Sequence, residues 1–315
     1  MEIFRIKHDI PFMKYAKTAT MLSALTFILA ILALLFRGLN LGVDFVGGTV
    51  MEVQYSQPAD IPAIRATLAQ AGYGEASVQT FGTSRDVSIR LPLKQQASLA
   101  KLSEHVLQAL KEKSPDVQMK RVDSVGGQVG KELLEQGSLA LLLVSAGIML
   151  YLALRFEWRF SVGAIVATAH DVVIVLGLFA FFQWEFSLSV LAAVLAILGY
   201  SVNDTVVVFD RIRENFRKMR KGSVAQIIDN AITRTLSRTV ITHVTTQLMV
   251  FSMLFLGGEV LFYFALALTL GIVVGTYSSV LVASPIVMWL GVSREDFVKT
   301  DKKPALKTEG VARES

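Results

Sequence analysis

Six long apolar runs constrain the fold of this chain more than any other feature of its sequence. A helix needs about 17 to 25 apolar residues to cross a bilayer, and every run is long enough. Of the 315 residues, 53% are hydrophobic and only 18% are charged, which is more apolar than a soluble domain of this length. We therefore expect a polytopic α-helical membrane protein with six transmembrane helices. The runs cover residues 19 to 36, 137 to 154, 161 to 183, 187 to 209, 239 to 257 and 260 to 290.

Basic residues in the short connections predict the orientation of these helices. Lys and Arg precede the first run, lie in RFEWR (155 to 159), and recur between the fourth and fifth runs and after the sixth. The connections around QWEF and GGEV have none. Short cytoplasmic loops are enriched in Lys and Arg, so both termini are expected in the cytoplasm. This topology also accounts for the net charge of +5 without any binding of nucleic acid.

The topology divides the chain into segments. The first run lacks a small-residue cleavage site and is as long as a true span, so we expect it to remain as an anchor. The predicted segments are a cytoplasmic N-terminus (1 to 18), the first helix (19 to 36), a periplasmic domain (37 to 136), helices two to six (137 to 290) with a basic cytoplasmic loop (210 to 238), and a cytoplasmic tail (291 to 315).

The outer segment contains strand-like and helix-like patterns in a recognisable order. Two stretches place apolar residues on one helical face, and Asp60 precedes the first of them as a suitable N-cap. Four stretches read as short strands with one buried face. The order βαββαβ predicts an α+β ferredoxin-like domain between the first and second transmembrane helices. The helical stretches are 60 to 71 and 98 to 110, and the strands are 49 to 55, 76 to 81, 86 to 91 and 116 to 122.

Several kinds of chemistry have no support in the sequence. The chain has no cysteine, its four histidines are scattered, and it contains no HExxH zinc motif. In the outer segment, His105 has no nucleophile nearby and is expected on a solvated helix surface. We therefore expect no metal, no cofactor and no enzymatic activity.

Asn203 and Asp204 lie within the fourth apolar run. A carboxylate at the centre of a membrane helix costs about 2.5 to 3.5 kcal/mol on insertion scales and is a functional hypothesis by default. Arg238 and Thr242 share one face at the start of the fifth run, which makes Arg238 the expected counter-ion. Burial favours the neutral carboxyl whereas a nearby Arg favours the carboxylate, so the balance can bring protonation within reach of the external pH. Protonation of Asp204 would release Arg238 and let the helices repack.

Other polar and small residues lie at membrane depth. Gly163, Ala167 and Asp171 fall on one line of the third run, so the carboxylate of Asp171 is expected to point into the bundle beside His170. Small residues at steps of three or four let helix backbones approach closely in lipid. Two such stripes are Ala267, Gly271, Gly275 and Ser279 in the sixth run, and Ser189, Ala192, Ala196 and Gly199 in the fourth.

Two protease alternatives fit these residues less well. Asp171 and Asp204 could form an intramembrane aspartyl dyad, but the Gly-Asp motif expected of such enzymes is missing. Arg238 would also keep one carboxylate ionised, whereas a dyad must share a proton. Ser201 with His243 could form a serine protease pair, but the expected Gly-x-Ser sequence is absent.

Several ordered motifs resemble the SecD/SecF family, which comprises membrane subunits of the bacterial Sec protein-export machinery and belongs to the resistance-nodulation-division superfamily. The resemblance covers nearly the whole chain, with the motifs at the expected boundaries of the spans. They are GVDFVGGT (42 to 49), VGGQVGKEL (125 to 133), RFEWR (155 to 159), AHDV (169 to 172), GYSVNDTVVVFDRIREN (199 to 215), SRTVITHVTT (237 to 246), GGE (257 to 259) and GTYSS (275 to 279).

The resemblance implies a function and partners that residue chemistry alone does not reach. It implies a proton-motive-force-driven role in late protein translocation across the bacterial inner membrane, with release on the outer side. The implied partners are SecD, the SecYEG channel, YajC and the translocating preprotein, and H⁺ is the coupling ion. A proton-coupled small-solute exporter of the same superfamily is the serious alternative, although such exporters usually have twelve spans and two large outer domains.

The resemblance also assigns residues. Asp204 matches the proton-pathway carboxylate of the fourth span, Arg238 matches an essential arginine of the fifth, and Asp171 matches a motif aspartate. Asn203 and Thr242 are further candidates beside them. The segment with Asp44, Phe45, Gly47, Gly48 and Thr49 is expected to join the first span to the outer domain, because its glycines suit tight turns and close approach.

Overall fold

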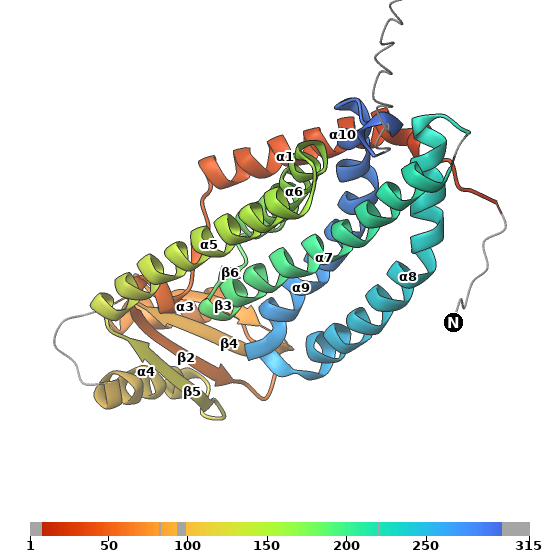
Figure 1. The fold of residues 1–315 in the computed structure, drawn as a ribbon. Coiled ribbons are helices and arrows are strands. Elements are labelled where there is room, and N and C mark those ends of the chain that lie inside the picture. The colour runs from red at the N-terminus through yellow and green to blue at the C-terminus, as the bar shows by residue number, and fades with distance from the viewer. Residues whose placement is uncertain (1–7, 82, 93–98, 220, 298–315) are drawn as a thin grey trace, which may run out of the picture.

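The computed structural model describes residues 8–81, 83–92, 99–219 and 221–297. Much of the expected cytoplasmic N-terminus and most of the expected tail lie outside these residues. Figure 1 shows a bundle of long helices with a small sheet-containing domain at one end, opposite α10.

Six helical segments in the described part of the chain are long and apolar enough to cross a membrane. This confirms the prediction of a polytopic helical membrane protein. Most of them extend beyond the predicted apolar runs, because hydropathy marks only the part suited to lipid. The helices are α1 (Ala16–Phe36), α5 (Gly127–Arg155), α6 (Trp158–Phe182), α7 (Leu188–Lys218), α8 (Val224–Leu256) and α9 (Gly258–Ser278), which continues through a π-helical turn, η2 (Ser279–Ala283), into α10 (Ser284–Trp289). Short 3-10 turns lie at Phe12–Tyr15 and Arg294–Asp296.

Residues 210 to 238, expected as a basic loop, are mostly helical. The helix α7 runs to Lys218, and α8 begins at Val224. Ser223 starts α8 with a capping box, in which its hydroxyl accepts from the backbone of Gln226 and the Gln226 side chain accepts from the Ser223 backbone. Charged residues can continue a helix into water just as apolar residues form it in lipid. The end of the apolar run therefore did not mark the end of the helix.

The outer domain has the predicted order of elements. Its four strands form one antiparallel sheet in the order β3-β4-β2-β5. The predicted cap is confirmed, because the Asp60 carboxylate accepts from the backbone of Ala63 at 3.1 Å. The elements are β2 (Gly48–Gln54), α3 (Ile61–Gln70), β3 (Ser77–Phe81), β4 (Thr83–Leu91), α4 (Leu99–Lys113) and β5 (Gln118–Val125).

The core of this domain follows from the alternation of its strands. Alternate residues of β2 are buried, and they pack with β4 against the apolar faces of α3 and α4. Side chains with no exposed surface include Met51, Val53, Val87, Ile89, Leu68 and Val106.

Small residues set the contacts inside the bundle, as the sequence predicted for α9. A Cβ added at Gly271 would lie only 2.3 Å from the Ile197 side chain of α7, so the two backbones approach closely. The stripe on α7 behaves differently. Ala192, Ala196 and Gly199 are exposed, and a Cβ at Gly199 would meet no atom within 4 Å. The spacing of small residues predicted a packing face, but the described part of this chain does not cover it.

A short parallel strand pair joins the two parts of the molecule. The strand β1 (Asn40–Leu41) pairs with β6 (Glu185–Phe186), which lies between α6 and α7. The short helix α2 (Val43–Val46) follows β1 and packs against α5. The connection after α1 is therefore held against the start of α7.

Candidate functional site

Two carboxylates are buried among the membrane-spanning helices. Asp171 of α6 has no exposed surface, and Asp204 of α7 is 6% exposed. The prediction that Asp171 points into the bundle is confirmed. Since a charge in this environment requires compensation, the groups around each carboxylate decide what it can do.

Asp171 is surrounded by one imidazole and two hydroxyls. Its Oδ1 lies 3.0 Å from Nδ1 of His170, which confirms the expected polar pair. Its Oδ2 accepts hydrogen bonds from Ser201 of α7 at 2.5 Å and from Ser278 of α9 at 2.7 Å. Asp171 therefore links three helices.

Asp204 has a similar set of neighbours from other positions. Thr239 of α8 donates to its Oδ1 at 3.2 Å, and Ser279 of η2 donates to its Oδ2 at 2.8 Å. Nε2 of His243 lies 3.7 Å from Oδ1, close enough for an ion pair when the imidazole is protonated. The other ring nitrogen of His243 bonds to the hydroxyl of Thr276. Asp204 thus joins α7 to α8 and to the end of α9.

Among the described contacts, no hydrogen bond or ion pair joins the side chains of the other predicted proton-pathway residues, Arg238, Asn203 and Thr242, to the Asp204 carboxylate. Arg238 is exposed, and no hydrogen bond or ion pair joins its guanidinium to another described residue. Asn203 is also exposed. The Thr242 hydroxyl donates to its own helix, with the carbonyls of Arg238 and Thr239 at 3.1 and 3.0 Å. Thr239, the next residue after Arg238, is the one that faces inward.

Sequence reasoning missed four of the groups that hold the carboxylates. The sequence marked two of them for other reasons, since Ser279 ended the predicted stripe of small residues and Ser278 lay in the GTYSS motif. Spacing marks which residues share a face, but it does not reveal which helix lies opposite. The missed partners are Thr239, Ser278 and Ser279, together with Ser201 in its bond to Asp171.

The protease alternatives find no support in this geometry. Ser201 donates to Asp171, and no hydrogen bond joins it to His243 among the described residues. The two carboxylates accept from different hydroxyls, and the described contacts include none between Asp171 and Asp204. The described residues also contain no group of three or more His, Cys, Asp or Glu side chains placed to hold a metal ion.

The predicted junction residues lie where α1, α5, α7 and the outer domain meet. Asp44 accepts from the backbone N–H of Leu188 at 2.8 Å, at the first residue of α7. Phe45 is 3% exposed, and its ring stacks on Phe186 at 5.9 Å. Thr49 bonds to Ser124 of β5 at 3.2 Å. Asp44 thereby ties the chain after α1 to the N-terminus of α7.

Both junction glycines have a backbone conformation that disfavours side chains. Gly47 has a φ of 73° and Gly48 has a φ of 136°. A Cβ on Gly48 would lie 2.7 Å from the carbonyl oxygen of Leu91. Gly130 of α5 packs against this turn so closely that a Cβ there would lie 2.9 Å from the backbone of Phe45 and Gly47. Only glycine fits these positions without rearrangement.

An ion pair connects the sheet to the same junction. Arg90 of β4 pairs with Glu185 of β6. Burial raises the pKa of the Glu185 carboxyl above its usual value, and the charge of Arg90 only partly offsets this. The pair therefore lies in a largely dehydrated contact between the outer domain and the membrane bundle.

These features define the class of protein: a polytopic membrane protein with hydrogen-bonded intramembrane carboxylates and a small outer domain attached at a glycine-rich junction. Residues 105–293 match the family model for the protein export membrane protein SecD/SecF, C-terminal, and residues 32–59 match the SecD/SecF GG motif. The chain belongs to the SecD/SecF family.

Curated relatives cover nearly the same length. The chain is 46% identical over 295 residues to the protein translocase subunit SecF of Vibrio alginolyticus, covering 93% of this chain and 94% of that protein. It is 46% identical over 283 residues to SecF of Pseudomonas aeruginosa, covering 89% and 92% respectively.

Two solved structures of SecDF are also similar. A crystal structure of SecDF from Thermus thermophilus, described as a translocon-associated membrane protein, matches with a TM-score of 0.80 and 36% identity over 91% of this chain. A SecDF structure in a super-membrane-facing form matches over the same share with a TM-score of 0.68 and 37% identity. The chain spans only 39% and 40% of those longer chains.

Proposed function

We propose that this chain is the accessory subunit of the Sec translocase that acts with SecD and uses the proton-motive force in late protein translocation. The observation that carries the proposal is the pair of buried carboxylates, each held by hydroxyls and close to an imidazole. A proton crossing the membrane releases about 2.3 kcal/mol per 100 mV, enough to bias a two-state element more than tenfold. Membership of the family supports a role in protein translocation, and the buried carboxylates support protons as the energy source.

The serine hydroxyls suit carboxylates that change protonation state. When Asp204 is ionised, Ser279 donates to it at 2.8 Å. When Asp204 is protonated, the acid donates to the hydroxyl, and the hydroxyl donates instead to the carbonyl of Thr276, 3.1 Å away. Ser278 has the same choice between Asp171 and the carbonyl of Gly275 at 3.2 Å. Both states therefore keep their hydrogen bonds.

The helix α7 can transmit a change at Asp204 to the outer domain. Asp204 lies sixteen residues beyond Leu188, which is about 24 Å along a helix. Leu188 bonds to Asp44 of the junction, so one rigid element connects the carboxylate to the turn that holds the domain.

The exposed face of α7 and α8 is proposed to pack against SecD. The stripe with Ala196 and Gly199 continues to Asn203, and Arg238 and Thr242 are exposed on α8. Polar groups at membrane depth require partners other than lipid. In the assembled pair, Arg238 would contact polar groups of SecD. Its charge at that interface can influence the protonation of the proton-pathway carboxylates.

The remaining features of the proposal follow the family. The outer domain is ferredoxin-like and periplasmic, both termini are cytoplasmic, and the protein lies in the inner membrane. SecYEG, YajC and the translocating preprotein are the further partners. H⁺ is the coupling ion, and the chain has no cofactor and no enzymatic activity.

The test compares Asp204→Asn with Thr205→Val in cells that depend on this chain. Thr205 is fully buried next to Asp204, and its hydroxyl has no hydrogen-bond partner among the described residues. Its variant is therefore a control at the same depth that leaves the carboxylate in place. Export of a secreted reporter is measured with and without a protonophore. We expect Asp204→Asn to lose the proton-dependent part of export while still inserting and binding SecD, and Thr205→Val to keep it. Normal proton-dependent export in Asp204→Asn cells would refute the proposal.

A further inference from the structure

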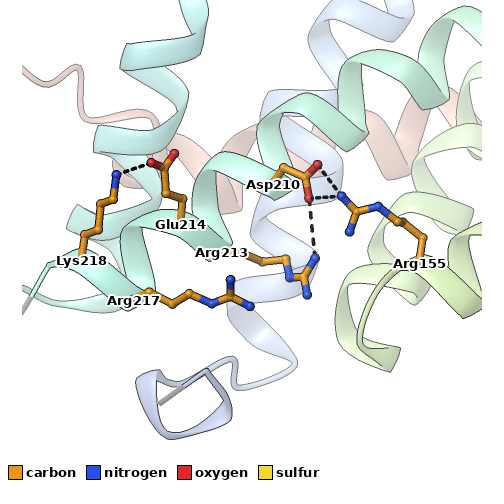
Figure 2. Close-up of a pocket in the computed structure, with 6 residues that line it drawn as sticks. All are labelled: Arg155, Asp210, Arg213, Glu214, Arg217 and Lys218. Atoms are coloured by element: carbon orange, nitrogen blue, oxygen red, sulfur yellow. Dashed lines mark hydrogen bonds and ion pairs between the residues drawn. The ribbon is translucent and has the colours of Figure 1, made fainter. Parts of the chain in front are cut away.

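A charged cavity at the far end of α7 lies apart from the proton site. Its volume is about 470 Å³, within the range of small-molecule sites. Four cationic and two anionic side chains line it, which leaves an excess of positive charge (Figure 2). The lining residues are Arg155, Asp210, Arg213, Glu214, Arg217 and Lys218.

The carboxylates of the cavity are already engaged by two of the cations. Arg155 donates to both oxygens of Asp210, at 3.0 and 2.8 Å. Lys218 and Glu214 form a second pair, one helical turn apart (Figure 2). Glu157 is a further carboxyl close to this group: burial raises its pKa above the usual value, and the charges of Arg213 and Arg217 only partly offset this. One positive charge therefore remains in excess even when Glu157 is ionised.

Arg213 and Arg217 are the cations of the cavity that can still donate hydrogen bonds to a ligand. Arg213 reaches Asp210 only at 3.6 Å, and its buried Nε has no hydrogen-bond partner in the part of the chain that the structure describes. Arg217 makes no hydrogen bond or ion pair with another described residue, and its guanidinium extends to the same side of α7 as that of Arg213 (Figure 2). Like charges one turn apart on a helix repel each other, so an anion between them would relieve the repulsion.

Aromatic contacts hold the site in place. The guanidinium carbons of Arg155 and Arg213 lie 5.1 and 5.5 Å from the centre of the Phe156 ring. Cation–π contacts of this kind reduce the freedom that an arginine would lose on binding. A planar guanidinium also matches the oxygens of a phosphate group.

The surface leading to the cavity is suited to lipid. Arg155 ends α5, and the preceding turn exposes Leu150 and Leu154, which are 61% and 80% accessible. Trp158, 61% exposed, begins α6 beside them, as aromatic residues often do at the edge of a membrane. An acyl chain lying along α5 would bring its headgroup to Arg155 and the cavity.

The geometry points to a site for the phosphate group of an anionic phospholipid, with Arg213 and Arg217 as its ligands and α5 as the surface for its acyl chains. Free phosphate shares the same chemistry, but it would gain nothing from the apolar face of α5. The site lies at the end of α7 remote from the outer domain. It therefore anchors the helix that carries Asp204.

The test measures lipid retained by the full chain. The protein is reconstituted in nanodiscs of phosphatidylethanolamine with increasing phosphatidylglycerol, transferred to mild detergent, and analysed by native mass spectrometry. Arg217→Gln removes one of the two guanidinium ligands of the phosphate and should reduce bound phosphatidylglycerol about tenfold, the effect of one hydrogen bond to a charged group. Arg213→Gln/Arg217→Gln should reduce it further. Arg217 makes no ion pair with another described residue, so Arg217→Gln should fold normally.

Two comparisons decide the outcome. Lys14→Gln/Lys17→Gln removes two exposed charges at the same end of the bundle and should retain phosphatidylglycerol as the parent chain does. Equal retention in Arg217→Gln and the parent overturns the proposal, as does an equal loss in the Lys14/Lys17 variant. Inorganic phosphate is titrated into nanodiscs of phosphatidylethanolamine alone. The titration is repeated in nanodiscs that contain phosphatidylglycerol, and saturable phosphate binding of equal strength in both would assign the cavity to a free anion instead.

Discussion

Ser278 and Ser279 are consecutive residues that donate to two different buried carboxylates, Asp171 at 2.7 Å and Asp204 at 2.8 Å. Adjacent residues of a helix point about 100° apart, so the pair reaches both sides of the same helix. The π-helical turn begins at Ser279, and such turns often mark functional sites. The two carboxylates are therefore connected through one short piece of backbone, and a change at one can reach the other.

Removing the Ser279 hydroxyl should weaken proton coupling. Ser279→Ala leaves Oδ2 of Asp204 without its donor, which costs about 1 to 3 kcal/mol of stability for a buried acceptor. We expect the proton-dependent part of export to fall in membrane vesicles. Ser284→Ala is the matched control, because Ser284 is equally buried but donates to the carbonyl of Ser279. An equal loss of coupling in both variants would mean that Ser279 acts through packing alone.

Substitutions at two glycines should distinguish an effect on the stability of this chain from an effect on its binding to SecD. Gly271→Leu overpacks the contact with Ile197 and should destabilise the purified chain by about 1 to 3 kcal/mol. Gly199→Leu meets open space, so its melting temperature should match the parent. Its co-purification with SecD should nevertheless drop sharply, since its side chain would occupy the proposed interface. Normal recovery of SecD by Gly199→Leu would place the interface elsewhere.

The junction should be sensitive to a single methyl group. Gly48→Ala combines a φ of 136° with a contact to Leu91, and strained residues of this kind cost about 1 to 3 kcal/mol each. Hydrogen exchange should increase in 43 to 54. Gly126→Ala serves as the control, because φ is −65° there and a Cβ added at Gly126 would meet no non-neighbouring atom within 4 Å. Unchanged exchange in Gly48→Ala would show that the junction adapts to a side chain.

The outer domain should lose stability in acid because of Asp86. Burial alone would raise the pKa of this carboxyl, but bonds from Thr83 and Lys120 lower it below its usual value of 3.8. A carboxyl with a lowered folded-state pKa contributes stability above its unfolded value, and the contribution disappears as the pH falls. We therefore expect the free energy of opening of β2 and β4, from hydrogen exchange corrected for intrinsic rates, to fall as the pH drops below about 5 and to go on falling through the lowered pKa of Asp86.

Lys120→Met should reduce this pH dependence, since it removes the cation 3.1 Å from Asp86. Arg121→Met is the control, because Arg121 pairs with Asp123 in an exposed contact. If the two variants show the same pH dependence, the effect does not come from Asp86.

Much of the architecture could be predicted because it depends on local pattern. The length of the apolar runs predicted the six helices, and alternation predicted the strands of the outer domain. The position of Asp60 before a helical stretch predicted its role as N-cap. The same reasoning placed Asp171 in the bundle interior, since it shares a line with Gly163 and Ala167. It failed at residues 210 to 238, where charged residues continue α7 and begin α8 in helical form.

By itself, the sequence determined that Asp171 and Asp204 are costly in a membrane helix and need compensation, because that cost depends only on the residue and its depth. Only the tertiary structure decided what compensates for it. Arg238 had the right charge, but it faces outward, and Thr239, Ser279 and His243 approach Asp204 instead. Helical spacing fixes which residues share a face, whereas the packing of α7, α8 and α9 fixes which faces meet.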